Sequence, residues 1–223
     1  MKTTLTLLAA FTTVSANAMI LDNFSVPYAR TINSGSWVDY QTDADIYTGE
    51  RDVALKILGT EGAAHYTIGE GKITLATEGA ERTFAYLEYD GVGDEVGNIG
   101  PGHDLIRNPR SDLHFPEGTR LVRFHVQSVS TPRIYVLGAR LFQNGTEMFS
   151  VFRNPSEAGI VDIPFAPSAF SICNTIELRV GLIDPNSSVV INKVELVPEP
   201  GSGLFYATGA ALVGFGRRRK SRG

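Results

Sequence analysis

Short segments that alternate apolar and polar residues constrain the fold of this chain more than any other feature of its sequence. Residues 51–58 place valine, leucine and isoleucine side chains on one face, and residues 120–127 and 175–182 repeat this period of two. No window between residues 19 and 197 keeps a helical period. The same reasoning predicts further strands at residues 64–68, 72–77, 83–89, 133–137, 140–143, 147–152, 160–163 and 189–197.

Turn-forming residues separate these segments. Asn144-Gly145 is the clearest hairpin signal, because a two-residue turn of this composition joins antiparallel strands with the correct twist. Residues 83–89 are apolar on both faces and therefore belong in the middle of a sheet or beneath a loop. The strands predict one all-β domain over residues 19–197, an antiparallel two-sheet β-sandwich that is jelly-roll-like, with helices only in the segments before and after it.

The first 18 residues are typical of a secretory signal peptide. Met1-Lys2 supplies the charged start, residues 5–14 supply the short apolar region, and Ala16-Asn17-Ala18 is a small-x-small cleavage site. The pattern predicts that signal peptidase recognises Ala16 and Ala18 and that the mature chain begins at Met19. The body is therefore expected to be exported.

The last segment, residues 198–223, has three blocks in a fixed order. Pro198-Glu199-Pro200 disfavours helix and predicts a stiff spacer that no folded element continues through. Residues 204–216 carry no charge, and as a helix they would span roughly 20 Å, less than the ~30 Å hydrocarbon core, so alone they predict a marginal inner-membrane anchor. A basic cluster follows that favours the cytoplasmic side, and it contains Arg217, Arg218, Arg219 and Lys220.

This order of blocks resembles the PEP-CTERM sorting signal of exported bacterial proteins. The resemblance implies that an exosortase, a membrane-embedded cysteine protease or transpeptidase, processes the tail and delivers the protein to the cell surface or extracellular matrix. Residues 48–53, 87–91 and 97–105 also resemble segments of an uncharacterised β-sandwich domain found in many PEP-CTERM proteins. The alternative is an ordinary C-terminal membrane anchor with a chance Pro-Glu-Pro triplet.

The charge of the mature body excludes one class of partner. Six of the 20 Lys and Arg residues, Lys2 and five in the tail, lie outside residues 19–200, which leaves 14 against 24 Asp and Glu and a net charge of −10 for that range. Nucleic acid is therefore not expected as a partner, whereas neutral polysaccharide and cations are compatible. Cys173 is the only cysteine, so no intramolecular disulfide can form, and its apolar neighbours predict a buried, unreactive thiol.

Two groups of residues are candidates for ligand binding. Acidic residues in the glycine-rich segment 88–104 could converge oxygen atoms on one Ca²⁺, and a solvated acidic loop is the alternative. Trp37 and Tyr40 lie beside three aspartates and could form a sugar-binding patch, although a lone tryptophan can equally be a packing residue. The candidate calcium ligands are Asp90, Asp94, Glu95 and Asp104.

Catalytic motifs are scarce. Glu50-Arg51-Asp52 begins the Glu-x-Asp-x-x-Glu pattern of some sandwich glycosidases, but position 55 is leucine. Arg51 and Asp52 point to opposite faces of their strand, so whichever faces the core needs a distant charged partner, and a structural ion pair is expected. The sequence predicts a non-enzymatic surface or matrix protein without a cofactor, apart from the possible Ca²⁺. A carbohydrate-binding module is the alternative, followed by a surface glycoside hydrolase.

Overall fold

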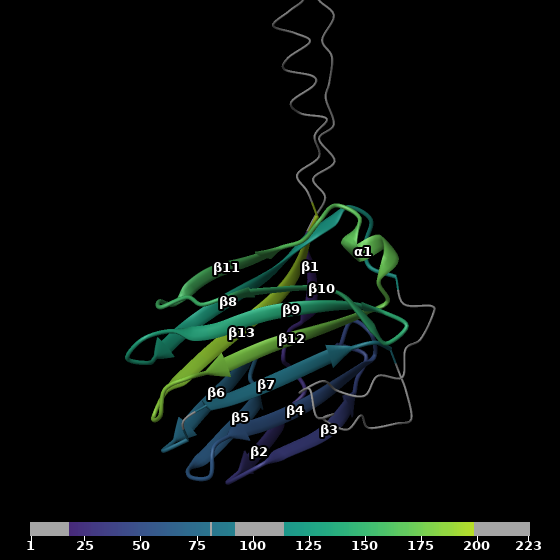
Figure 1. Cartoon of the computed structure of the whole chain (residues 1–223). Coiled ribbons are helices and arrows are strands. Elements are labelled where there is room, and N and C mark those ends of the chain that lie inside the picture. The colour runs from purple at the N-terminus through teal and green to yellow at the C-terminus, as the bar shows by residue number, and fades with distance from the viewer. Residues whose placement is uncertain (1–17, 81, 92–113, 199–223) are drawn as a thin grey trace, which may run out of the picture. The chain divides into compact units, whose positions relative to one another are not determined.

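The computed structural model describes residues 18–80, 82–91 and 114–198, which form one compact unit between Ala18 and Pro198. Two antiparallel sheets face each other in this unit, as Figure 1 shows. The predicted all-β, two-sheet sandwich is therefore confirmed. The helices expected before and after the body fall outside the described residues.

The first sheet, called sheet A, has seven strands. Its order is β11–β8–β13–β6–β5–β2, and β1 pairs with the second half of β13. All of its pairs are antiparallel. The strands are β1 (Met19–Asp22), β2 (Tyr28–Ile32), β5 (Ala63–Gly69), β6 (Lys72–Glu78), β8 (Thr119–Ser130), β11 (Gly159–Pro164) and β13 (Ser188–Pro198).

The second sheet, called sheet B, has six strands in the order β10–β9–β12–β7–β4–β3. It forms the front layer in Figure 1, with sheet A behind it. One short helix, α1 (Ala169–Ile172), precedes its strand β12. The strands are β3 (Ser36–Thr42), β4 (Glu50–Leu58), β7 (Arg82–Tyr89), β9 (Tyr135–Gln143), β10 (Thr146–Arg153) and β12 (Thr175–Leu182).

Every strand predicted from alternation is present. Segments 133–137 and 140–143 form the single strand β9, whereas β1, β2, β3 and α1 were not predicted. β7 lies between β12 and β4, the central position that its two apolar faces indicated. The Asn144-Gly145 hairpin is confirmed, because Gln143 pairs with Thr146 and both turn residues have positive φ, +50° and +77°.

A buried ion pair links the two sheets. Arg51 points inward from β4 and its guanidinium donates to the carboxylate of Asp22 on β1 and to the side-chain oxygen of Gln41 on β3. The Asp22 carboxylate also accepts hydrogen bonds from the Tyr89 hydroxyl (3.0 Å) and from the backbone N–H of Phe24 (2.7 Å). Arg51 and Asp22 are both buried. The structural ion pair expected for this position is therefore confirmed, with Asp22 as the distant partner.

The lone cysteine is buried in the core, as predicted. Burial raises the pKa of the Cys173 thiol to about 11, which keeps it protonated and unreactive at neutral pH. Across the ranges 18–80, 82–91 and 114–198, no helix is long and apolar enough to cross a membrane.

Candidate functional site

The outer face of sheet B, which points away from the core, is more densely packed than an ordinary solvated sheet surface. Ala54, Phe84 and Tyr86 form a second buried apolar cluster there, separate from the main core between the sheets. Half-buried aliphatic side chains from β3, β4 and β9 pack around this cluster. The strands are therefore apolar on both faces near the centre of sheet B, which explains why β7 lacks simple alternation.

Two glycines form a floor on which aromatic rings of this face lie. A Cβ atom at Gly138 would stand 2.0 Å from Cδ1 of Phe152, and one at Gly181 would stand 2.5 Å from Cδ1 of Phe84. The Arg179 guanidinium lies over both rings, 4.0 Å from the centroid of Phe84 and 5.4 Å from that of Phe152. The result is a stack of a cation and two rings supported directly by the backbone of β9 and β12.

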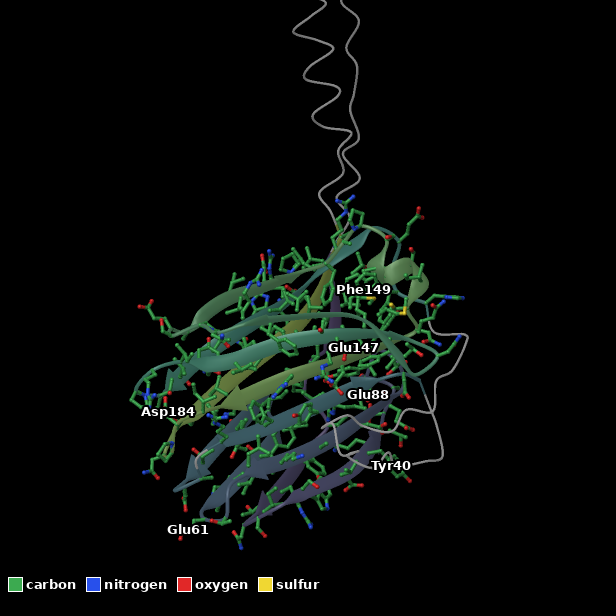
Figure 2. The ribbon with its side chains drawn as sticks, in the orientation of Figure 1. Tyr40, Glu61, Glu88, Glu147, Phe149 and Asp184 are labelled. Atoms are coloured by element: carbon green, nitrogen blue, oxygen red, sulfur yellow. The ribbon has the colours of Figure 1, made fainter. Side chains whose placement is uncertain are left out.

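Charged side chains cross the same face in a row. Arg140 on β9 is 12% exposed and lies between Glu177 of β12 (3.6 Å) and Glu147 of β10 (3.5 Å). Glu177 and Glu88 are buried. The register of the five strand pairs aligns one outward residue from each strand, from β3 to β10: Tyr40, Asp52, Glu88, Glu177, Arg140 and Ser150. Figure 2 shows Tyr40, Glu88 and Glu147 following one another across the sheet.

Asp52 carries a strongly perturbed carboxyl group on this face. Burial, followed by the nearby carboxylates of Asp90 and Glu50, raises the pKa of Asp52 to about 7. The side chain is only 4% exposed. The group therefore carries a proton during part of the time at neutral pH, and this end of the outer face changes charge between mildly acidic and mildly basic conditions.

Only one of the predicted calcium ligands can be placed. Asp90 is buried just after β7, near enough to Asp52 to raise the pKa of that carboxyl group, whereas Asp94, Glu95 and Asp104 lie outside the described residues. In the part of the chain that the structure describes, no three His, Cys, Asp or Glu side chains are grouped as metal ligands.

Trp37 and Tyr40 do not form one patch. The register of β3 with β4 puts Trp37 opposite the buried core residue Leu55, so Trp37 faces inward, and Tyr40 faces outward. The Trp37 ring stacks on Tyr28 at a centroid distance of 5.5 Å and lies 4.6 Å from the Arg30 guanidinium. Trp37 therefore packs against the core at the edge of the sandwich, whereas Tyr40 is 45% exposed at the margin of the outer face.

The sorting residues lie almost entirely outside the described residues. These are Glu199, Pro200, Arg217, Arg218, Arg219 and Lys220, together with Ala16 of the signal peptide. Ala18 directly precedes β1. Pro198 was predicted to lie beyond the last folded element, but it ends β13 and pairs with Thr119 of β8, so the strand continues into the first residue of the triplet.

The sequence patterns did not indicate most of the residues that build the outer face. Arg140, Phe152, Glu177 and Arg179 were not singled out, because each occupies the polar or outward position of an otherwise ordinary strand. One signal was present: Gly138 and Gly181 interrupt strands that are rich in large residues, and a glycine inside a strand often marks the close approach of another group.

Comparison with known proteins gives only distant structural similarities. No family model and no curated protein sequence matches the chain. A family 11 carbohydrate-binding module of a cellulosomal cellulase from Clostridium thermocellum is 14% identical, with a TM-score of 0.36 over 81% of this chain and 95% of the module.

Two larger proteins are similar at the same level. The enzymatically active domain of tailspike protein 4 of bacteriophage CBA120 is 11% identical, with a TM-score of 0.32 over 83% of this chain and 21% of that chain. A β-1,2-glucanase from Parabacteroides distasonis is 14% identical, with a TM-score of 0.35 over 82% of this chain and 25% of that chain. The chain thus spans about a fifth and a quarter of these two proteins. At such identities and TM-scores, what they bind or cleave does not carry over to this chain.

Proposed function

We propose that this protein is an exported, non-enzymatic polysaccharide-binding protein of the cell surface or extracellular matrix, and that it binds polysaccharide on the outer face of sheet B. The observation that carries this proposal is the stack of Arg179, Phe84 and Phe152 on the glycine floor. Holding a matrix polymer would give the protein a structural or adhesive role. We also propose that the sandwich is a jelly roll, because successive strands pass repeatedly from one sheet to the other.

The chemistry of the outer face suits a polymer rich in hydroxyl groups. Sugars are recognised by flat apolar surfaces combined with a few fixed hydrogen-bonding groups. The half-buried Phe152 ring offers such a surface, and the half-buried guanidiniums of Arg140 and Arg179 offer planar sets of donors. Glu177, buried beside Arg140, would hold that arginine in place rather than contact the ligand.

Hydrolysis of the bound polymer is a second candidate, and Asp52 favours it. A carboxyl group with a pKa of about 7 beside other carboxylates has the properties of a general acid in glycoside hydrolysis. Burial of Asp52 argues against it, because a general acid must reach the glycosidic oxygen.

One incubation tests both functions. The purified body, residues 19–198, is expected to sediment with extracellular polysaccharide prepared from the cells that produce it, and to release no new reducing ends from it. Soluble protein after sedimentation, at polysaccharide concentrations well above those needed for known binding modules, would contradict the binding proposal. New reducing ends that disappear in the Asp52→Asn variant would instead establish hydrolysis.

Delivery is a separate part of the proposal. We propose that signal peptidase removes residues 1–18, that residues 204–216 hold the chain transiently in the inner membrane, and that an exosortase-type protease processes the tail. No metal or other cofactor is required for this role. Pro198, Glu199 and Pro200 are the proposed recognition residues, and Arg217 to Lys220 retain the tail on the cytoplasmic side.

Replacing Glu199 and Pro200 with alanine is expected to block processing without unfolding the body, because both residues lie beyond the compact unit. The intact mass of the protein from the surface fraction measures this directly. The wild type should lack residues 1–18 and the tail, whereas the variant should keep its tail and stay with the membrane. A wild type that kept its tail would make residues 198–223 an ordinary anchor, and loss of the tail from both proteins would mean that Glu199 and Pro200 are not recognition residues.

A further inference from the structure

We infer that the bound polysaccharide is anionic, and that Arg179 binds the carboxylate of a uronic acid unit in it. This inference rests on the proposed function and specifies the chemical class of its ligand. The observation behind it is a cation that lies on aromatic rings and has no ion-pair partner in the part of the chain that the structure describes.

The guanidinium of Arg179 contacts rings rather than acidic groups. Its central carbon lies 4.0 Å from the ring centroid of Phe84, 5.4 Å from that of Phe152 and 5.5 Å from that of Tyr86. Among residues 18–80, 82–91 and 114–198, no carboxylate pairs with it, and its buried Nε atom has no hydrogen-bond partner. Arg179 therefore keeps a planar set of donors for a ligand.

A second half-buried arginine of the same face is already matched. Arg140 lies between Glu177 (3.6 Å) and Glu147 (3.5 Å), so two carboxylates balance its charge. A partly buried cation without such partners is unfavourable unless another group compensates for its lost hydration. The rings compensate in part for Arg179 through cation–π attraction, and the carboxylate of a ligand would supply the remainder.

Another basic side chain lies near the same ring. Lys56 of β4 is opposite Phe84 of β7 in the strand register and faces the same side of the sheet. Lys56 is half-buried, and within the described ranges no carboxylate pairs with it. β4 and β12 flank β7 in the front layer of Figure 1, so Lys56 and Arg179 approach the Phe84 ring from the strands on either side. Two cations near apolar side chains suit an acidic sugar.

The groups that such a ligand would touch are accessible. Arg179, Lys56 and Phe152 are each partly exposed, whereas Phe84 and Tyr86 are buried. The two buried rings hold the guanidinium in place, and the ligand does not need to reach them. Because the guanidinium is already held, less conformational entropy is lost when it binds a carboxylate.

Local charge rather than net charge favours an anionic ligand here. Residues 19–200 carry 14 Lys and Arg against 24 Asp and Glu, a net charge of −10. Charges more than about 8 Å apart are largely screened at physiological ionic strength, so the side chains in direct contact decide which ligand binds. An arginine suits a carboxylate best, because its two parallel N–H donors match the two oxygens.

Long fragments of the same extracellular polysaccharide test the inference in two forms, native and with their carboxylates chemically reduced to primary alcohols. In calorimetric titration of residues 19–198, the native fragments are expected to bind at least about tenfold more tightly, as expected for a hydrogen bond to a charged group. Arg179→Met keeps an apolar side chain over Phe84 but removes the charge and the donors. This variant should bind native fragments at least about tenfold more weakly than the wild type, and reduced fragments equally tightly.

Arg30→Met is the matched control, because Arg30 also lies over an aromatic ring, 4.6 Å from the centroid of Trp37, but on β2 of sheet A. It should bind both forms as the wild type does. Equal affinity of the wild type for both forms, binding of a native polysaccharide that contains no carboxylate, or an Arg179→Met variant that loses no affinity or loses it equally for both forms overturns this inference and leaves polysaccharide binding in place. Absence of binding to either form overturns the proposed function as well.

Discussion

Replacing Arg51 with methionine is expected to lower the free energy of unfolding by about 3–5 kcal/mol, because it leaves a buried carboxylate without its cation. Asp22 and Arg51 are both buried, and the carboxylate would keep only the hydroxyl of Tyr89 and the N–H of Phe24 as donors. Urea unfolding of residues 19–198 followed by tryptophan fluorescence measures the change. Trp37 suits this purpose because it is half-buried at the edge between the sheets.

Two further variants show whether the loss of stability in Arg51→Met comes from burial of the ion pair or from the loss of any charge pair. Arg123→Met breaks the Arg123–Asp162 pair, which has good bidentate geometry (2.7 and 2.9 Å) but lies partly exposed on sheet A, and should cost no more than about 1 kcal/mol. Adding Asp22→Asn to Arg51→Met should restore part of the lost stability, because the neutral amide still accepts from Tyr89. If Arg51→Met cost no more than Arg123→Met, the pair would not link the two sheets energetically.

The fold could be predicted from the sequence wherever a strand buries one face. Alternation is the physical signature of that condition, and β4, β8 and β12 show it because one side of each faces the core. β2 and β3 escaped prediction because they are edge strands with several exposed residues and no continuous apolar face. β2 pairs with β5 and β3 pairs with β4. These pairings cannot be recognised from the residues of β2 and β3 alone.

The site could be predicted far less well than the fold. The sequence indicated that Arg51 required a distant partner, but Asp22 is 29 residues away, and that separation follows from the sheet arrangement. Likewise, Arg179 stacks on Phe84 and Phe152 only because β12 lies between β7 and β9. Sequence proximity favoured Trp37 with Tyr40 as a patch, yet an odd spacing along a strand puts them on opposite faces.

Adding a methyl group at Gly138 is expected to weaken polysaccharide binding by about tenfold or more, which corresponds to about 1.4 kcal/mol. The new Cβ atom would occupy the position of the Phe152 ring, which must swing away from the sheet. Phe152 is half-buried on an edge strand, so the ring can move outward with a modest loss of stability. Calorimetric titration with long polysaccharide fragments and urea unfolding measure the two effects.

Gly145→Ala separates affinity from stability, because it adds the same methyl group to the turn that joins β9 and β10. Its φ of +77° makes that substitution strained, but nothing lies within 4 Å of the added atom, so it should lower stability and leave affinity unchanged. Phe152→Ala should weaken binding as much as Gly138→Ala, and the double variant should be no weaker than either, since all three remove the same ring from its place. Additive losses in the double variant would mean that Gly138 contributes to binding by a route other than the ring it supports.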